Sequence, residues 1–349
     1  MRIAGAASAF PKHEYGQDAI VEILKQYWNG RLQNPQVLER LHSRTGVERR
    51  HLVLPLEEYL AVDTFGKAND LWIENAVQLG SDAICRAITP LGLEPSAIDA
   101  LYFVSVTGIC SPSIDARLIN RMGLSTALKR NPIFGLGCVA GAAGIARAAD
   151  YVRAFPEQIA VVLSVEICSL TWQREDVSVA NLISSGLFGD GAAAVVVAGS
   201  ETGLSGPRVV ATKSVFYPHT EEVMGWDISE KGFRIVLSPE VPNMVHKHLA
   251  HDVDEFLASQ GLQRSDVSSW IIHTGGPKVL DAVQEALELP DHALDASWEC
   301  LRQVGNLSSA SVLVVLQDYL SHRRGEPGTY SVLSAMGPGF CSELVLLQW

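Results

Sequence analysis

The stretch Phe134–Ala148, FGLGCVAGAAGIARA, decides the fold of this chain. It begins as a strand or loop and continues as a helix of almost only glycine and alanine. Because such a helix lets neighbouring backbones approach closely, we place it at the centre of the molecule. Cys138 lies in the first turn, where the helix dipole and unpaired N–H groups make a thiol more acidic. Cys138 is therefore a candidate nucleophile; the alternative is a buried structural cysteine.

Short buried strands alternate with helices on both sides of this stretch, a pattern typical of an α/β protein. We expect a long helix over residues 69–93, capped by Asn69 and Asp70. The apolar N-terminal residues are too few and too interrupted for a signal peptide, so we expect a first strand there. The strands expected are residues 2–7, 99–107, 159–166, 190–197, 207–216 and 268–273.

The second half of the chain repeats the order of the first. A buried strand ends at Gly108, thirty residues before Cys138, and another ends near Gly275, thirty-one residues before Asn306. Asn306 opens a helix of small residues, as Cys138 does. We therefore predict two related halves, residues 1–205 and 206–349, whose helix N-termini meet at one centre.

Two polar residues of the second half would reach that centre. His273 ends a buried strand, where α/β sheets commonly present ligands. It could pair with Cys138 as thiolate and imidazolium, and together with the amide of Asn306 it could hold a developing oxyanion. The alternatives are a buried core histidine and an ordinary helix N-cap asparagine.

Composition narrows the class of protein. The formal net charge of −12 over 349 residues argues against a nucleic-acid partner, although a local basic patch could still bind one anionic cofactor. No apolar run is long enough to span a membrane. The six cysteines are scattered without metal-ligand or disulfide spacing, which favours a reduced, cytoplasmic protein. The basic cluster 44–50 is either a phosphate-binding patch or a solvated loop.

Several motifs together resemble one family, the type III polyketide synthases, which are the chalcone-synthase-like branch of the thiolase fold. The resemblance covers nearly the whole chain and implies an α/β fold of two pseudo-symmetric βαβαβαββ halves in five αβαβα layers. The motifs are GCVAG (137–141), LFGDGAAA (187–194), GFRIVLSPEVP (232–242), HTGGP (273–277), GNLSS (305–309) and GPGF (337–340).

The resemblance implies roles for particular residues. Cys138 would take an acyl group from a CoA thioester, while His273 and Asn306 would hold the malonyl-CoA carbonyl during decarboxylation. Phe188 would separate the CoA tunnel from the cavity. The remaining expected substrate-binding residues are Cys168, Thr171, Ile235 and Ser308 in the cavity, and Arg44, Arg49, Arg50 and Lys278 at the CoA phosphates. Lys278 could instead be a solvated residue of a helix's first turn.

The family also implies acyl-CoA and malonyl-CoA as substrates, a homodimer, and no metal or other cofactor. Cys168 in place of a cavity threonine and Ile235 near a second gating position make the chain most similar to bacterial alkylpyrone and alkylresorcinol synthases. We therefore expect a fatty acyl starter and a pyrone or resorcinol product. The alternatives are a ketoacyl synthase III-like enzyme that performs one condensation, and a non-catalytic acyl-CoA-binding relative.

Overall fold

The computed structural model describes residues 1–32 and 34–349. Its strands are β1 (Arg2–Ala9), β2 (His13–Gly16), β3 (Arg49–Leu52), β4 (Ala100–Val104), β5 (Lys129–Ile133), β6 (Ile159–Ile167), β7 (Asp190–Ala198), β8 (Arg208–Phe216), β9 (Met224–Ser229), β10 (Gly232–Leu237), β11 (Val267–Ile272), β12 (Tyr330–Gly337) and β13 (Cys341–Gln348). Its α-helices are α1 (Gln17–Tyr27), α2 (Gln36–His42), α3 (Phe65–Ile88), α4 (Ile114–Met122), α5 (Ala140–Ala154), α6 (Val179–Leu187), α7 (Val241–Ala258), α8 (Pro277–Leu287), α9 (Asp295–Val304) and α10 (Ser311–Ser321).

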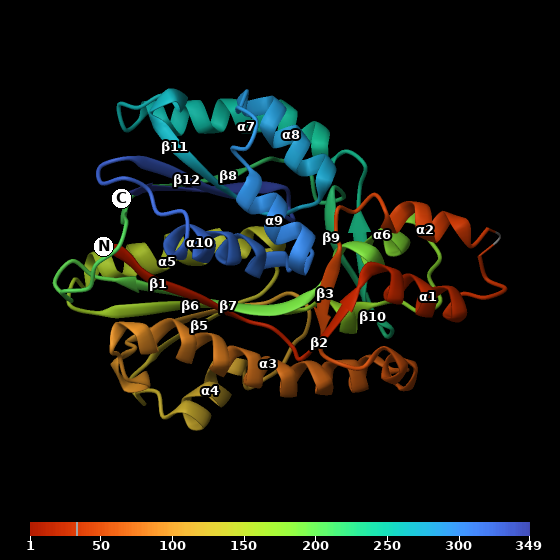
Figure 1. Cartoon of the computed structure of the whole chain (residues 1–349). Helices are drawn as coiled ribbons and strands as arrows, with labels where there is room; N and C mark the ends of the chain where they lie inside the picture. The colour runs from red at the N-terminus through yellow and green to blue at the C-terminus, as the bar shows by residue number, and fades with distance from the viewer. Residues whose placement is uncertain (33) are drawn as a thin grey trace.

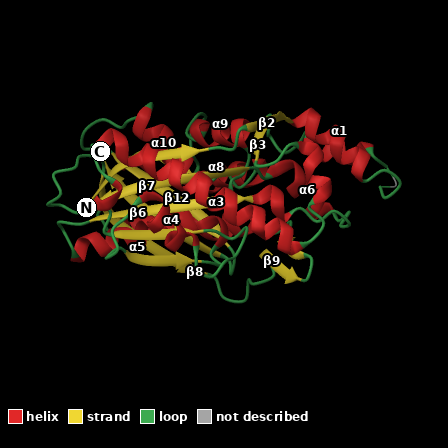
Figure 2. Cartoon of the chain, turned by 90° about the horizontal axis from the view of Figure 1, so that it is seen from below, coloured by secondary structure: helices red, strands yellow, loops and turns green. Residues whose placement is uncertain are grey.

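The strands of the large sheet and the helices packed on them stack in five layers, αβαβα, as Figure 1 shows. Helices α7 and α8 cover one outer face, and α3 and α4 cover the other. Helices α5 and α10 lie between the two sheet layers. Both chain termini lie at one end of the molecule, and α1 and α6 lie at the opposite end (Figures 1 and 2). The predicted α/β class and layer order are confirmed.

The strand order follows the repeat. The large sheet runs β11-β12-β13-β8-β1-β7-β6-β4-β5. In the first half, β4 is parallel to β6, and β6 is antiparallel to β7. In the second half, β11 is parallel to β12, and β12 is antiparallel to β13. The two halves of the sheet join through the β1–β8 pair at Arg2 and Arg208. The boundary at residue 205 stays a prediction, and it falls in the loop between β7 and β8.

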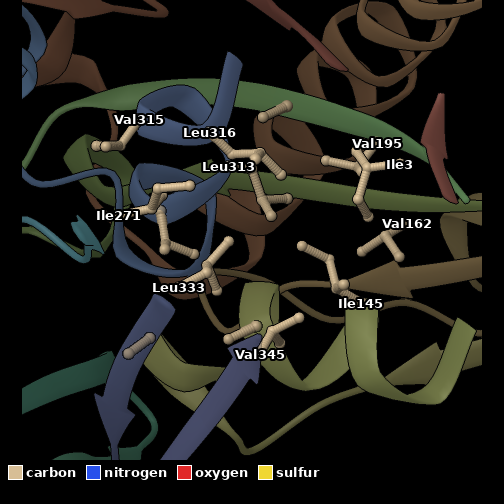
Figure 3. Close-up of a cluster of buried hydrophobic side chains, with 14 of the residues drawn as sticks. Ile3, Ile145, Val162, Val195, Ile271, Leu313, Val315, Leu316, Leu333 and Val345 are labelled. Carbon is tan, nitrogen blue, oxygen red and sulfur yellow. The ribbon is translucent and has the colours of Figure 1, made fainter. Parts of the chain in front are cut away.

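The glycine- and alanine-rich helix α5 lies in the middle of the core. Its side chain Ile145 packs in one cluster with Val162 of β6, Leu313 of α10 and Val345 of β13 (Figure 3). At Gly141 an added Cβ would lie 2.2 Å from the carbonyl oxygen of Ser309. Glycine at this position therefore lets α5 touch the turn that precedes α10.

Replacing Gly141 by alanine is expected to destabilise the protein by about 1–3 kcal/mol, because the methyl group meets backbone that has to move. The matched control is Gly66→Ala in α3, where an added Cβ meets nothing within 4 Å and helix propensity favours alanine by up to about 1 kcal/mol. Urea unfolding of both variants measures the difference. Equal free energies of unfolding for the two variants would show that α5 and the Ser309 turn are not in close contact.

The long helix α3 begins earlier than its sequence predicts. The prediction of a start capped by Asn69 and Asp70 is wrong, because the Thr64 side chain caps the helix and accepts the Lys67 backbone N–H. The helix ends at Ile88 rather than at residue 93, ahead of Pro90. Over residues 1–32 and 34–349, none of the helices combines the length and apolar character that crossing a bilayer requires.

Candidate active site

Cys138, His273 and Asn306 come together from three different elements. Cys138 lies in a short 3₁₀ turn, Gly137–Val139, that leads directly into α5. His273 follows the last residue of β11, and Asn306 follows α9 after one intervening residue. All three side chains are buried, and they line a single cavity of about 550 Å³. The two halves of the chain thus contribute to one site.

Backbone contacts fix the position of each residue. Gly137 has a φ of +56°, and an added Cβ would lie 2.5 Å from Pro338, so this turn requires glycine. The backbone N–H of His273 donates to the Ser334 carbonyl at 3.0 Å. Asn306 is held from both sides by the segment before β7: its N–H donates to the Leu187 carbonyl, and its own carbonyl accepts from Gly189.

The amide of Asn306 has a defined orientation. Its Oδ1 accepts the backbone N–H of Ser308 at 2.7 Å and the hydroxyl of Ser311 at 3.4 Å. Across the described chain, its Nδ2 donates to no protein acceptor. Because the oxygen is occupied, the N–H₂ group remains as the donor that Asn306 can offer to a ligand in the cavity.

Burial is the main cause of the shifted pKa values of Cys138 and His273. It raises the pKa of the Cys138 thiol to about 12 and lowers the pKa of His273 to about 4. The expectation that this thiol is more acidic than usual is wrong, because loss of solvent disfavours the thiolate. A reactive thiolate here needs a group that accepts the proton, and the imidazole of His273 in the same cavity is a candidate. The Nδ1 atom of His273 is buried without a hydrogen-bond partner.

Ser308 and Glu166 complete the surroundings of Cys138. The Ser308 hydroxyl lies 3.6 Å from the Cys138 sulfur, and Ser308 has a left-handed backbone with a φ of +48°. The fully buried carboxylate of Glu166 accepts the hydroxyls of Ser309 and Thr107, and burial raises its pKa. Glu166 therefore ties β6 to the turn after Asn306. The sequence interpretation missed it, although a lone charge within a valine-rich strand is a usable signal.

Phe188 lies at the boundary between two cavities. It lines the 550 Å³ catalytic cavity and also a side pocket of about 80 Å³. Cys168, Thr171 and Ile235 line the side pocket and not the catalytic cavity. Phe188 and Asn306 form an isolated parallel β-bridge, so the backbone at Phe188 and the backbone at Asn306 are held together.

The four basic residues expected at the CoA phosphates separate into two groups. Arg44 and Lys278 are exposed and line the catalytic cavity. Arg49 is exposed, lies outside the linings of both cavities and pairs with Glu14 at 3.2 Å.

The assignment of Arg50 to the CoA phosphates is wrong. Its side chain is only 2% exposed and lines the side pocket. Its Nη1 donates to the Phe188 carbonyl at 2.6 Å and its Nη2 to the Gln17 side chain at 2.8 Å. Each terminal nitrogen of Arg50 thus already has a hydrogen-bond partner within the protein.

Comparison with known proteins gives matches along nearly the whole chain. Residues 3–201 match the family model "Chalcone and stilbene synthases, N-terminal domain", and residues 208–349 match the corresponding C-terminal domain. A 1,3,6,8-tetrahydroxynaphthalene synthase of Streptomyces peucetius subsp. caesius is 49% identical, over 99% of this chain and 93% of that protein. A phloroglucinol synthase of Pseudomonas fluorescens is 34% identical, over 97% of each chain.

Among solved structures, the 1,3,6,8-tetrahydroxynaphthalene synthase of Streptomyces coelicolor A3(2), described as a bacterial type III polyketide synthase, superposes with a TM-score of 0.95. It is 34% identical in sequence, and the match covers 100% of this chain and 99% of that one. The motifs and the fold thus lead to the same family.

Proposed function

The chain belongs to the chalcone and stilbene synthase family and is a type III polyketide synthase, and from this premise we propose the roles of its site residues and the class of its starter. Cys138 takes the starter acyl group from a CoA thioester. His273 and Asn306 hold the oxygen of malonyl-CoA on which charge develops. The observation that carries these roles is that all three residues line one cavity, with the Asn306 amide oriented as a donor.

In the loading step, the Cys138 proton passes to His273, and the thiolate attacks the thioester carbonyl. The carbon–sulfur bond to CoA then breaks, and the leaving thiolate takes the proton back from His273. CoA would enter past Arg44 and Lys278, the two cavity-lining cations with exposed side chains. Their charge suits its phosphates.

In the extension step, the bond between the malonyl methylene carbon and its carboxylate breaks, and carbon dioxide leaves. The electron pair moves onto the thioester oxygen, where N–H donors from His273 and Asn306 stabilise the enolate. The enolate carbon attacks the acyl group on Cys138, and the sulfur leaves as thiolate. No metal ion or further cofactor enters this path, and CoA thioesters are the substrates.

We propose that the starter is short and that the product is an aromatic polyphenol. The side pocket of about 80 Å³ is smaller than the cavities of about 150 Å³ that hold benzene. The relative of 49% identity is named for 1,3,6,8-tetrahydroxynaphthalene. The hydroxyl groups of that product lie on alternate carbons, as two-carbon malonyl units place them, and it carries no alkyl chain.

A fatty acyl starter, with a pyrone or resorcinol product, is the second candidate. Apolar side chains of α1, Ile20, Ile23 and Leu24, line the side pocket, and each methylene buried there would contribute roughly 0.8 kcal/mol. However, a long chain would have to displace the wall formed by Tyr27 and Trp172. Their ring centroids lie 4.8 Å apart, and both residues also line an outer cavity on the other side.

Product analysis of the purified protein tests both candidates. We expect polyketides of several extensions from malonyl-CoA with no starter or with acetyl-CoA, and little product from dodecanoyl-CoA. Product lengths that require a dodecanoyl starter would favour the second candidate. A single extension would indicate a ketoacyl synthase III-like enzyme, and no reaction would indicate a non-catalytic relative.

A pocket-filling variant refines this test. Replacing Thr171 by phenylalanine in the side pocket is expected to leave acetyl-sized starters active and to reduce the use of hexanoyl-CoA. Equal losses for both starters in a folded variant would mean that Thr171 only packs the protein. The matched variant Cys168→Phe fills the same pocket from a neighbouring position and should act in the same direction.

A homodimer and a cytoplasmic location complete the proposal. Strand β5 forms an edge of the large sheet. Phe134, directly after β5, is 49% exposed, and a second copy of the chain could bury this apolar side chain. Light scattering tests this association. The six cysteines are free, which fits a reducing compartment.

A further inference from the structure

Arg50 and Asn306 hold the two ends of one peptide group. Arg50 Nη1 donates to the carbonyl of Phe188 at 2.6 Å. The N–H of the same peptide group, which belongs to Gly189, donates to the carbonyl of Asn306 at 3.0 Å. Because a peptide group is planar, a side chain that fixes its oxygen also fixes the direction of its N–H. The hydrogen bond from Arg50 therefore helps to fix the backbone of Asn306.

The side chain of Arg50 also packs beside the residue that precedes Asn306. A Cβ added at Gly305 would lie 3.0 Å from Arg50 Cδ and 2.7 Å from the carbonyl oxygen of Leu187. That same carbonyl accepts the N–H of Asn306 at 2.9 Å. Arg50 and Leu187 thus enclose the backbone at Gly305 so closely that a side chain there would displace them.

The segment that carries Arg50 is joined to the helix before Asn306 as well. The backbone N–H of Glu48 donates to the carbonyl of Arg302 in α9 at 2.9 Å, and the two side chains form an ion pair at 3.1 Å. Strand β3 lies beside α9 in Figure 1. Residues 48–50 therefore connect the two segments between which Asn306 lies, α9 and residues 187–189.

Gln17 holds the guanidinium of Arg50 in place. Its Oε1 accepts Arg50 Nη2 at 2.8 Å, and its Nε2 donates to the Gly186 carbonyl at 2.7 Å and to the Thr45 hydroxyl at 3.0 Å. The side chains of Gln17, Thr45 and Arg50 are all buried. Because buried hydrogen-bond networks with satisfied members are rigid, Arg50 has a fixed position before any substrate arrives.

We propose that Arg50, held by Gln17, is a positioning residue that directs the Asn306 amide toward the oxyanion of malonyl-CoA. The inference rests on the proposed function, in which Asn306 is an oxyanion donor. Arg50 lines the side pocket and not the catalytic cavity, so it acts through Asn306. A displacement of about 1 Å in a catalytic group costs about a hundredfold in rate, which makes this backbone support matter for decarboxylation.

The variant Arg50→Met tests the proposal, because it keeps a long unbranched side chain and removes every donor. Malonyl-CoA decarboxylation at saturating substrate should fall roughly ten- to a hundredfold, while the KM for malonyl-CoA stays within about twofold. Starter loading, measured as acyl-enzyme mass, should fall by less than about threefold, since the Cys138–His273 pair performs it.

Gln17→Met is the second variant, and it decides the question if Arg50→Met does not fold. Methionine has nearly the size of glutamine but leaves Arg50 Nη2 and the Gly186 carbonyl without their partner. Decarboxylation should fall roughly three- to tenfold, the effect of weakening one hydrogen bond. Loading should again change less than decarboxylation.

A double-mutant cycle separates an effect through Asn306 from any other effect. If Arg50 acts through Asn306, Arg50→Met should change decarboxylation by less than about twofold in a protein that already carries Asn306→Ala. A residue with an independent effect would lower the rate of Asn306→Ala by the same factor as that of the wild type. Circular dichroism of each variant shows that it is folded.

The matched control is Arg86→Met in α3. Arg86 Nη1 also donates to a backbone carbonyl, that of Ser8, at 2.9 Å. The residue lines neither the catalytic cavity nor the side pocket. Both half-reactions of this variant should therefore equal those of the wild type.

The inference alone fails if Asn306→Ala loses decarboxylation while folded Arg50→Met and Gln17→Met keep the wild-type rate. It also fails if the effects of Arg50→Met and Asn306→Ala multiply, or if loading and decarboxylation fall by equal factors, which indicates a structural role. If Asn306→Ala itself decarboxylates malonyl-CoA at the wild-type rate, the proposed role of Asn306 is wrong and the inference is overturned with it.

Discussion

Replacing His273 by glutamine is expected to slow the alkylation of Cys138 by iodoacetamide at pH 7 by at least about a hundredfold. Burial raises the pKa of this thiol to about 12, so without a proton acceptor very little of it is thiolate at pH 7. In the proposed mechanism, the imidazole of His273 takes the thiol proton as the sulfur attacks the reagent. Glutamine keeps polar bulk but cannot accept that proton.

The pH dependence of the same reaction has a definite sign. Because the thiol pKa lies far above neutrality in the variant, the alkylation rate should rise about tenfold per pH unit between pH 7 and 9. Peptide mass spectrometry follows each cysteine separately, and the exposed Cys85 serves as the internal control, with the same rate in both proteins. A variant whose Cys138 reacts as fast as the wild type would remove His273 from this role.

Replacing Asn306 by alanine is expected to reduce malonyl-CoA decarboxylation by about 10²- to 10³-fold, the usual effect of losing one oxyanion donor. Starter loading should fall by less than about tenfold, because the Cys138–His273 pair performs it. Radiolabelled carbon dioxide release measures the first half-reaction, and acyl-enzyme mass measures the second.

The matched variant Asn306→Asp separates the donor from the structural role of this side chain. An aspartate keeps an Oδ1 acceptor for the Ser308 N–H, so the local turn persists, but it replaces the N–H₂ donor by a negatively charged oxygen. Decarboxylation should therefore be lost in both variants. If Asn306→Asp retained decarboxylation while Asn306→Ala lost both half-reactions, Asn306 would be a structural cap and not an oxyanion donor.

Much of the fold follows from local patterns that the chain carries twice. Gly141 in α5 is required for steric reasons, because a Cβ added there would lie 2.2 Å from the carbonyl oxygen of Ser309. The nearly equal spacings, thirty residues from Gly108 to Cys138 and thirty-one from Gly275 to Asn306, anticipate the matching strand orders of the two halves. The start of α3 was less predictable, since Thr64, Asn69 and Asp70 are all plausible caps and only the backbone conformation selects one.

The basic cluster at residues 44–50 illustrates what local patterns leave open. Arg49 and Arg50 are neighbours in sequence and alike in chemistry. In strand β3 they point to opposite faces, so that Arg49 is exposed and Arg50 is buried. A charge count cannot decide which neighbour faces inward, because the direction is set by the strand's partner and by Phe188 and Gln17, which lie far away in sequence.

The sequence by itself determined the α/β class, the repeat and the family, because periodicity, glycine placement and motif order are local properties. Only the tertiary structure decided that burial raises the pKa of the Cys138 thiol, that Glu166 supports the turn after Asn306, and that Arg50 is buried with a hydrogen bond to the Phe188 carbonyl. These properties depend on desolvation and on partners distant in the chain. Both arise only when the layers pack together and remove water.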